Sequence, residues 1–347
     1  MSETMRAARF VTPGRGVEVQ DVPCPKPGPL DVLIRVEACG ICLSDVHLFD
    51  GSIPPVIQPV TPGHEACGVI EELGELVSGW RVGQRVSLMG GRPCARCPAC
   101  RTGRMDACQN LQIMGFHYDG AWAELVVVPF YCLTEVPNEI VPEQAAILAD
   151  AVATPYAAIS ERAALRPGES IGLWGIGGLG THAVQIARLL GAGLIVAIDP
   201  LASARERALA LGADAAIDPT TQDVVGEITA LSSGNKLDVA VDLVGANAVM
   251  KQAVHCLGSR GRAVMVGLSL EALELGPGIL LGVQSQSVLG HLGYQKKHLD
   301  DLVTLLVRGR LDLSRSITDV LPLEDVAQGV DRLANKVGDP VRLIVRP

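Results

Sequence analysis

The amino-acid sequence predicts an α/β protein with two domains, a β-rich N-terminal domain and a domain built on a doubly wound parallel sheet. Over about the first 130 residues, short apolar or alternating runs are separated by Gly and Pro, which is typical of strands and turns. Farther along, short apolar runs alternate with helical stretches that end at a glycine, which is typical of repeated strand–helix–strand units. The chain has 347 residues, enough for each domain to bury its own core.

The expected elements are taken in chain order. In the β-rich domain we expect strands at residues 7–11, 17–22 and 32–38, with further strands and turns from 67 to 88. An alanine-rich helical stretch at 143–166 leads into the second domain. There we expect buried strands at 170–174, 194–198, 215–217, 239–243 and 263–266, and helices at 181–190, 203–211 and 246–257.

The end of the chain is expected to return to the first domain. An amphipathic helix at 297–308 leads to a strand-like tail at 341–345. The parallel sheet is already complete without this tail. We therefore expect a discontinuous domain of residues 1–151 and 292–347, and a sheet domain of residues 152–291.

Composition narrows the class of function. Hydrophobic residues make up 48% of the chain and charged residues 19%, which favours a packed globular enzyme over a disordered chain. The net charge of -9 gives no electrostatic reason to bind nucleic acid or an anionic membrane. The N-terminus lacks a signal-peptide pattern and no apolar run is long enough for a membrane span, so a cytoplasmic protein is expected. In a reducing compartment, clustered cysteines among the ten present indicate metal binding.

A glycine motif predicts dinucleotide binding. Residues 175–180 read G-x-G-x-x-G between a predicted strand and a predicted helix, where the turn brings backbone N–H groups to a pyrophosphate. Asp199 ends the next strand and would accept from the ribose hydroxyls, which favours NAD over NADP. The alternative for this side chain is a helix N-terminal acid before Pro200. The expected coenzyme residues of this motif are Gly175, Gly177, Gly178, Gly180 and Asp199.

Four cysteines predict a structural metal site. Cys94, Cys97, Cys100 and Cys108 lie in a short loop rich in Gly, Pro and Arg, and four thiolates favour a closed tetrahedral zinc site. An iron–sulfur cluster is the rival interpretation, but the long final gap and the lack of a proline after Cys108 argue against it. Four unrelated free cysteines are the other alternative.

A second metal site is suggested by residues that are distant in sequence. The stretch from Cys39 to His47 places a thiol at Cys42 close to a hydroxyl at Ser44 and an imidazole, a set suited to a metal ligand with a proton relay. His64 is a candidate second ligand, and Glu65 beside it is a carboxylate that could enter or orient the ligand shell. These residues have simpler alternatives, a buried apolar cysteine and a hydrogen-bonded loop histidine.

The third candidate ligand is Asp150, which stands within an otherwise apolar run from Ala145 to Ala153. A carboxylate in such surroundings is costly unless it is paired or bound to a cation, so metal binding would offset that cost. A helix cap or a surface acid is the alternative.

With these residues the sequence resembles the zinc-dependent medium-chain alcohol dehydrogenases over essentially its whole length. The pattern Gly63-His64-Glu65-x-x-Gly68-x5-Gly74-x-x-Val77 matches the zinc signature of that family, followed in order by the cysteine loop and the glycine motif. The resemblance implies a GroES-like catalytic domain with a structural zinc lobe at 94–108, a Rossmann coenzyme domain, and two zinc ions per subunit. It assigns the catalytic zinc to Cys42, His64 and Asp150, a proton relay to Ser44 and His47, and a place near the nicotinamide to Thr154.

Two departures from the family pattern refine this expectation. Many relatives have a second Cys where this chain has Asp150, but a bacterial branch that acts on secondary alcohols and ketones has Asp there. Leu43 stands where some relatives place a pyrophosphate-binding Arg or a His. The chain also lacks the insertion of the dimeric animal enzymes after Cys108, so the resemblance favours a homotetramer over a dimer.

The expected function is reversible, NAD-dependent hydride transfer between a secondary alcohol and a ketone, with primary alcohols and aldehydes as further candidates. The alternatives are a polyol or sugar-alcohol dehydrogenase of the same superfamily and a non-catalytic nucleotide-binding relative. Phe49, Trp122 and Tyr294 are candidates for the substrate wall, and the lack of polar residues near them favours an apolar or aryl substrate.

Overall fold

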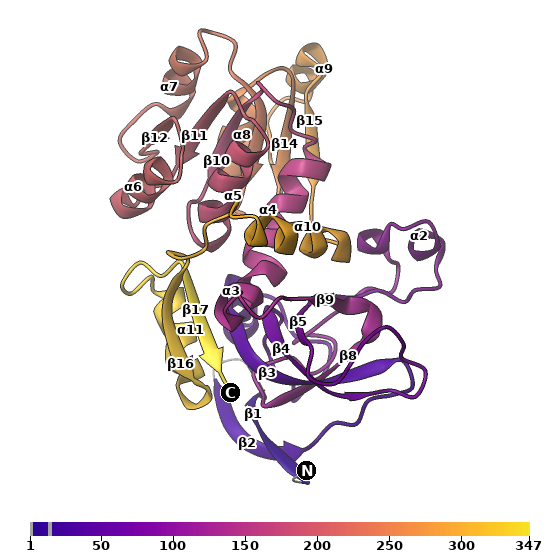
Figure 1. The fold of residues 1–347 in the computed structure, drawn as a ribbon. Coiled ribbons are helices and arrows are strands. Elements are labelled where there is room, and N and C mark those ends of the chain that lie inside the picture. Colours follow the sequence, from indigo (N-terminus) through magenta and orange to yellow (C-terminus); the bar gives the residue numbers. More distant parts are fainter. Residues whose placement is uncertain (1–2, 13–15) are drawn as a thin grey trace. The chain divides into compact units, whose positions relative to one another are not determined.

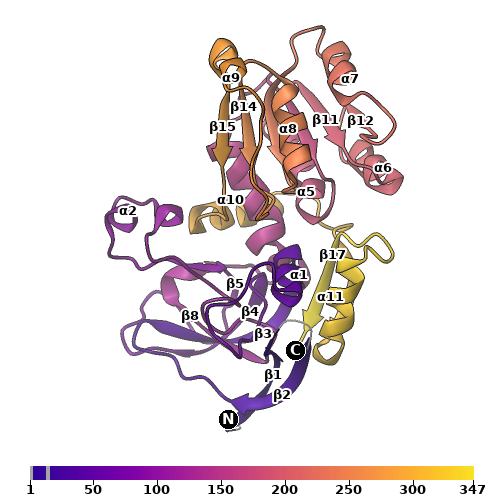
Figure 2. The same ribbon diagram turned by 180° about the vertical axis from the view of Figure 1, so that it is seen from behind.

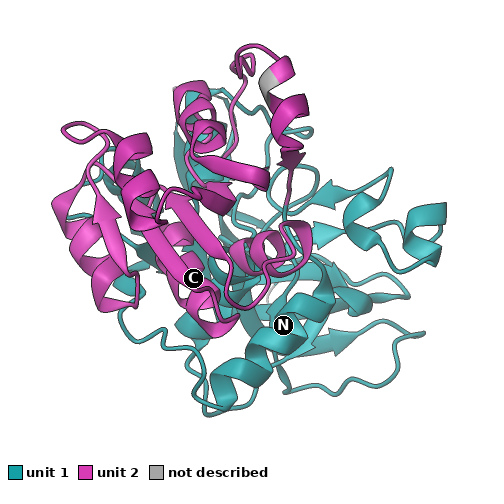
Figure 3. Cartoon of the chain, turned by 90° about the horizontal axis from the view of Figure 1, so that it is seen from above, with its two compact units in different colours: residues 1–153, 293–347 teal, residues 154–292 magenta. Residues whose placement is uncertain are grey.

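The computed structural model describes residues 3–12 and 16–347. The chain divides into two compact units, which Figure 3 distinguishes by colour. One unit combines Met1–Ala153 with Gly293–Pro347, and the other spans Thr154–Leu292. We call them the catalytic unit and the coenzyme unit. The domain boundaries expected from the sequence differ from these junctions by two residues at the first and by one at the second.

The catalytic unit is built on a seven-stranded sheet with the order β16-β17-β3-β4-β5-β9, in which β8 also pairs with β3. The C-terminal strand β17 pairs antiparallel with β3, and Val345 lies opposite Cys39. Residues from the two ends of the sequence therefore share the strand pair that leads into Cys42. The strands are β3 (Asp31–Ile41), β4 (Ala66–Leu73), β5 (Arg85–Leu88), β8 (Leu125–Pro129), β9 (Leu133–Glu135), β16 (Ile317–Pro322) and β17 (Arg342–Arg346).

Smaller elements surround this sheet, as Figures 1 and 2 show from opposite sides. The core of the unit contains Ile34, Leu88 and Trp122, all fully buried. The remaining elements of the unit are β1 (Thr4–Phe10), β2 (Val17–Pro23), α1 (Leu43–Asp50), β6 (Gly91–Arg92), α2 (Pro98–Arg101), η1 (Met105–Ala107), β7 (Gln112–Ile113), η2 (Phe130–Cys132), α3 (Pro142–Ile147), η3 (Leu148–Val152), α10 (Lys296–Val307), η5 (Leu323–Asp325) and α11 (Val326–Ala334).

The coenzyme unit contains a six-stranded parallel sheet with the order β12-β11-β10-β13-β14-β15. The order reverses between β10 and β13, which is the point where doubly wound sheets bind their ligands. Helices α5 and α6 pack together, as do α7 and α8. The strands are β10 (Ser170–Trp174), β11 (Leu194–Ile198), β12 (Ala215–Ile217), β13 (Leu237–Asp242), β14 (Leu257–Met265) and β15 (Ser287–Gly290). The helices are α4 (Ala153–Ala157), which spans the junction, η4 (Ala158–Arg162), α5 (Gly178–Leu189), α6 (Ala202–Ala210), α7 (Val224–Leu231), α8 (Asn247–His255) and α9 (Ile279–Gln284).

The structure confirms the predicted mixed α/β class and corrects some elements. The strand β15 and the helices α7 and α9 are absent from the sequence-based prediction, because such short segments carry little periodicity. Helix α5 begins at Gly178 and not at residue 181, because the end of the glycine motif already forms its first turn. No helix of the described ranges is both long and apolar enough to cross a membrane.

The close packing of the glycine turn leads to a stability prediction. A Cβ atom on Gly180 would lie 2.0 Å from the carbonyl oxygen of Gly175, whereas a Cβ on Gly177 would meet nothing within 4 Å. We expect Gly180→Ala to lower the stability of the coenzyme unit by about 1–3 kcal/mol, since the backbone must shift. Thermal unfolding would measure this, with Gly177→Ala as the matched control. Equal melting temperatures for the two variants would contradict the packing argument.

Candidate metal and coenzyme sites

The first candidate ligand, Cys42, lies at the junction of β3 and α1. Its backbone is extended and precedes the first turn of the helix. The backbone N–H of Cys42 donates to the Oδ2 atom of Asp45 at 2.9 Å, which fixes both residues at the helix start. The thiol is buried and Asp45 is fully buried.

The second candidate ligand, His64, belongs to the loop that leads into β4. Gly63 has a φ of 93°, and a Cβ there would lie 2.5 Å from the ring of Trp122. The turn therefore requires glycine both for its backbone and for the close approach of the indole. Asp45 lies on the Nδ1 side of this ring, with 3.6 Å between its Oδ1 atom and Nδ1 of His64.

The third candidate ligand, Asp150, lies in the π-helical turn η3. Such turns are rare and are found frequently at functional sites. Both neighbours of Asp150 are held by side chains. The N–H of Ala151 donates to Oε1 of Glu65 at 2.7 Å, and the carbonyl of Ala149 accepts from the hydroxyl of Tyr294.

These three side chains converge although they are far apart in sequence. The Sγ atom of Cys42 lies 3.2 Å from Oδ2 of Asp150, and Nε2 of His64 lies 3.9 Å from the same oxygen. Ligands at zinc–donor distances of about 2.0–2.3 Å in a tetrahedron are separated by about 3.3–3.8 Å. The donor set of one thiol, one imidazole and one carboxylate, all mutually within 4.8 Å, therefore fits a zinc ion with an open fourth position.

Buried charge gives a second reason to expect a cation there. Burial raises the pKa of the Cys42 thiol, which the carboxylate of Asp150 raises further, and burial also raises the pKa of Asp45. Burial likewise raises the pKa of Glu65 to about 7. Burial alone would lower the pKa of Arg342, but the carboxylate of Glu65 reverses this, so the guanidinium stays charged. A divalent cation would offset the cost of the remaining buried negative charge.

Arg342 is the residue that sequence reasoning missed. It is only 2% exposed, its Nη1 atom donates to the carbonyl of Ile41 at 3.2 Å, and its Nη2 atom lies 3.3 Å from Oε1 of Glu65. The same nitrogen is 3.6 Å from Oδ2 of Asp150. A single charge within the apolar tail from Val341 to Val345 was the available signal.

The two predicted relay residues have different surroundings. The hydroxyl of Ser44 lies 3.2 Å from Nε2 of His64, beside the candidate metal position. His47 lies farther along α1, with its side chain one-third exposed and its Nδ1 atom 3.6 Å from Oδ2 of Asp50. Ser44 is thus placed to exchange a proton with a group held by the three ligands, and His47 to exchange one with solvent.

The four cysteines predicted to bind a structural metal form a compact lobe around α2. Sγ of Cys97 lies 3.5 Å from that of Cys100 and 3.9 Å from that of Cys108, too far for disulfides but suited to tetrahedral thiolates. Backbone N–H groups of Arg96 and Cys97 lower the pKa of Cys94 to about 6. The lowered pKa of Cys94 favours its thiolate form, which is the form that binds a cation.

The glycine motif lies in the turn between β10 and α5, with a φ of 88° at Gly175. The unpaired N–H groups of the first helical turn begin at Gly178, which suits an anion. Asp199 follows β11 directly and accepts from Ile176 N–H at 2.7 Å and from Leu201 N–H at 2.8 Å, one bond to each oxygen. Each oxygen retains a second lone pair that could accept from a ribose hydroxyl. Thr154 lies buried in α4.

The expected substrate wall is corrected by the structure. Trp122 is fully buried and its Nε1 atom donates to the carbonyl of Gly40 at 3.4 Å, so it is a core residue. Phe49 packs against Phe10 and Trp122, at centroid distances of 5.3 Å and 6.3 Å. The aromatic ring that lies near a candidate ligand is Phe116, whose centroid is 6.1 Å from that of His64. The sequence did not predict that Phe116 and His64 lie close together, because the chain makes several turns between these two residues.

Comparisons with known proteins agree with this architecture. The family model described as "Alcohol dehydrogenase GroES-like domain" matches residues 28–138, and the model "Zinc-binding dehydrogenase" matches residues 178–308. An NAD-dependent alcohol dehydrogenase from Sulfurisphaera tokodaii is 33% identical over 340 residues, which cover 95% of this chain and 97% of that protein. An L-threonine 3-dehydrogenase from Pyrococcus horikoshii is 34% identical over 328 residues, covering 92% of each.

Solved structures show the same fold. The alcohol dehydrogenase TADH from Thermus sp. ATN1 superposes with a TM-score of 0.92 at 30% identity, covering 99% of both chains. Similarity at this level extends over both units and includes the lobe and the glycine motif. The chain therefore belongs to the zinc-binding alcohol dehydrogenase family of the medium-chain dehydrogenase/reductase superfamily.

Proposed function

We propose that the protein is a zinc-dependent, NAD-linked alcohol dehydrogenase that interconverts a secondary alcohol and its ketone. The observation that carries this proposal is the convergence of Cys42, His64 and Asp150 on one point, with the Ser44 hydroxyl beside it. A protein that only bound nucleotide would not need this set. Family membership supports the reaction class, because one relative named above is an NAD-dependent alcohol dehydrogenase and another is an L-threonine 3-dehydrogenase.

A zinc ion held by these three residues would, when bound, act as a Lewis acid that lowers the pKa of the substrate hydroxyl. The residues around it perform the remaining tasks. Ser44 accepts the proton of the alcohol at its Oγ atom, and His47 delivers it to solvent at the far end of the relay. Asp45 orients His64 from its Nδ1 side. A second zinc ion, held by the four cysteines of the lobe, has a structural role because no ligand position is left open.

The coenzyme unit is proposed to bind NAD. The pyrophosphate would lie at the N-terminus of α5, and the Asp199 carboxylate would accept from both ribose hydroxyls and repel a 2′-phosphate. Thr154 is proposed to lie near the nicotinamide by likeness to the family. Bound NAD would supply the acceptor for the hydride that leaves the substrate carbon.

A second candidate substrate class is supported by the threonine dehydrogenase relatives, since L-threonine is itself a secondary alcohol with polar substituents. A polyol or amino-alcohol substrate would need polar partners near the metal site. The ring beside His64, that of Phe116, is buried in a hydrophobic cluster with Phe10 and Leu48 and offers no polar partner at that position.

The protein is further proposed to be a cytoplasmic homotetramer. All ten cysteines are free thiols, which suits a reducing compartment. In the coenzyme unit β15 is an edge strand, and the side chains of Ile279 and Val283 in α9, the helix just before it in the chain, are 71% and 73% exposed. An open strand edge beside exposed aliphatic side chains favours association with a second copy.

Replacing Asp150 by Asn should remove the catalytic zinc and leave the structural zinc in place. The amide is a weak zinc donor and cannot balance the charge of the cation. The zinc content measured by elemental analysis should then fall from two ions per chain to one, and alcohol oxidation should be lost. Cys100→Ser serves as the reciprocal control, since it should remove the lobe zinc only. Unchanged zinc content in Asp150→Asn would contradict the ligand assignment.

Replacing Ser44 by Ala should lower turnover by about 100-fold or more with full zinc content, because proton transfer by a positioned group contributes at least that much. Steady-state kinetics and metal analysis on one preparation would measure both. Ser232→Ala is the matched control, since that hydroxyl donates to the carbonyl of Ile228 at 2.7 Å in the coenzyme unit. Normal turnover in Ser44→Ala would rule out the relay.

Replacing Asp199 by Asn should weaken NAD binding by about tenfold and improve the relative binding of NADP, because the carboxylate charge is lost. Titration of coenzyme binding by fluorescence measures both constants without turnover. Asp218→Asn is a control that removes one partly buried carboxylate, an ion-pair partner of Arg205. A variant with the original NAD preference would support the helix-start role of Asp199 alone.

A further inference from the structure

Tyr294 occupies a position that the expected substrate-wall role does not explain. Its hydroxyl donates to the carbonyl of Ala149 and accepts from the backbone N–H of Gly90 at 3.0 Å. Ala149 is the residue directly before Asp150. A phenol whose donor and acceptor are both engaged by backbone groups has little capacity left to bind a substrate.

The second partner of Tyr294 connects it to His64. A Cβ on Gly90 would lie 2.8 Å from the carbonyl oxygen of His64, so the backbones of Gly90 and His64 are in direct contact. The Tyr294 hydroxyl therefore bridges two segments. One contains Gly90, which packs against the backbone of His64, and the other is the turn that carries Asp150. Both segments belong to the catalytic unit, as does Tyr294 itself.

The backbone that carries Tyr294 leads into a helix that is packed firmly in the catalytic unit. Two residues later helix α10 begins, and α10 packs against both β9 and the π-helical turn η3. Leu299 and Leu302 are fully buried, and Thr134 of β9 donates to Asp300 at 2.8 Å. The bridge thus joins the metal-site turn to a helix that is anchored independently.

The turn that bears Asp150 is then held from both sides. On one side Glu65 accepts from the N–H of Ala151, and on the other Tyr294 donates to the carbonyl of Ala149. A π-helical turn has an irregular hydrogen-bond pattern, so outside partners decide where its side chain points. We propose that Tyr294 is a positioning residue that sets the direction of the Asp150 carboxylate toward the catalytic metal; the inference rests on the proposed zinc site.

The experiment compares Tyr294→Phe with the wild-type holoenzyme. Loss of the hydroxyl removes one hydrogen bond from the carbonyl of Ala149 and one from the N–H of Gly90, so the turn can relax. Removal of a hydrogen-bond partner behind a metal ligand typically weakens metal affinity 10- to 100-fold. We expect the catalytic zinc to transfer to a chromogenic chelator at least about tenfold faster, with the lobe zinc unaffected. The phase that is missing in Asp150→Asn identifies the catalytic zinc in the release curve.

Replacing zinc by cobalt gives an absorption spectrum that would not change if the variant were only less stable. In Tyr294→Phe, the d–d bands of Co²⁺ at the catalytic site should shift, because the geometry of the oxygen ligand changes. The tetrathiolate bands of the lobe should stay unchanged.

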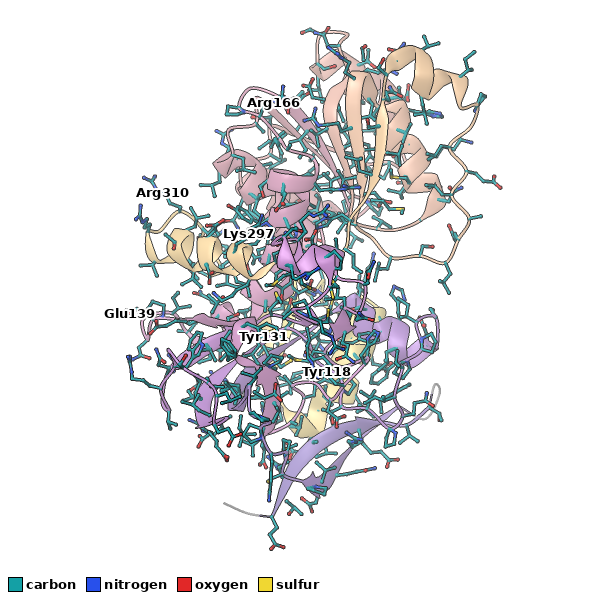
Figure 4. The ribbon with its side chains drawn as sticks, turned by 90° about the vertical axis from the view of Figure 1, so that its right-hand side faces the viewer. Tyr118, Tyr131, Glu139, Arg166, Lys297 and Arg310 are labelled. Carbon is teal, nitrogen blue, oxygen red and sulfur yellow. The ribbon has the colours of Figure 1, made fainter. Side chains whose placement is uncertain are left out.

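Two other tyrosines of the catalytic unit, labelled in Figure 4, serve as controls. The Tyr118 hydroxyl is buried without a hydrogen-bond partner among the described residues, and that of Tyr131 donates to the carbonyl of Pro93 at 2.9 Å. Tyr118→Phe should leave catalytic zinc release and both sets of cobalt bands as in the wild type. Tyr131→Phe should leave catalytic zinc release and the d–d bands of the catalytic site unchanged, because its partner Pro93 precedes the lobe ligand Cys94 and not a catalytic ligand.

Three results would contradict this account: the first refutes the zinc site, and the other two refute the positioning role. Wild-type protein without a second metal would refute the proposed zinc site itself. Wild-type release kinetics and spectra in Tyr294→Phe would refute the positioning role. Equal loss of both metals in that variant, with a lower melting temperature, would refute it as well, because Tyr294 would then serve the stability of the whole unit.

Discussion

The fully buried carboxylates of Asp45 and Glu65 and the partly buried carboxylate of Asp150 surround the thiol of Cys42, and the guanidinium of Arg342 faces them from the C-terminal strand. Burying several acids together is unfavourable unless cations balance them. Arg342 supplies one positive charge and the imidazole of His64 lies among the acids. A divalent cation at the point where the three ligands meet would complete the balance. The catalytic unit therefore encloses a cluster of charged side chains whose charges must balance one another.

The fold brings these groups together from four separate segments. Cys42 directly follows strand β3, the loop before β4 presents His64 and Glu65, the turn η3 presents Asp150, and β17 returns from the C-terminus with Arg342. Each segment is tied to another through a backbone group, such as the N–H of Ala151 on Glu65. The geometry of the site is therefore a property of the whole sheet and not of one motif.

Much of this was predictable from the sequence. The parallel strands from residue 170 onward and the cysteine lobe have strong local patterns. Asp150 stood out as an acid in an apolar run, Cys42 by the hydroxyl and imidazole close to it in the sequence, and His64 as a possible second ligand for Cys42. The roles of Arg342, Tyr294 and Trp122 were not predictable in the same way. Their partners lie between 82 and about 300 positions away, and no local pattern reports which backbone carbonyl a buried side chain will meet.

The most direct test of the account is a joint measurement of zinc content and NAD reduction on the purified wild-type protein. We predict two zinc ions per chain and formation of NADH with at least one secondary alcohol from a panel of apolar, aryl and polyol substrates. One zinc ion per chain, retained in the cysteine lobe, together with no NADH from any alcohol, would contradict the account. The buried acids around Cys42 would then need another counter-charge.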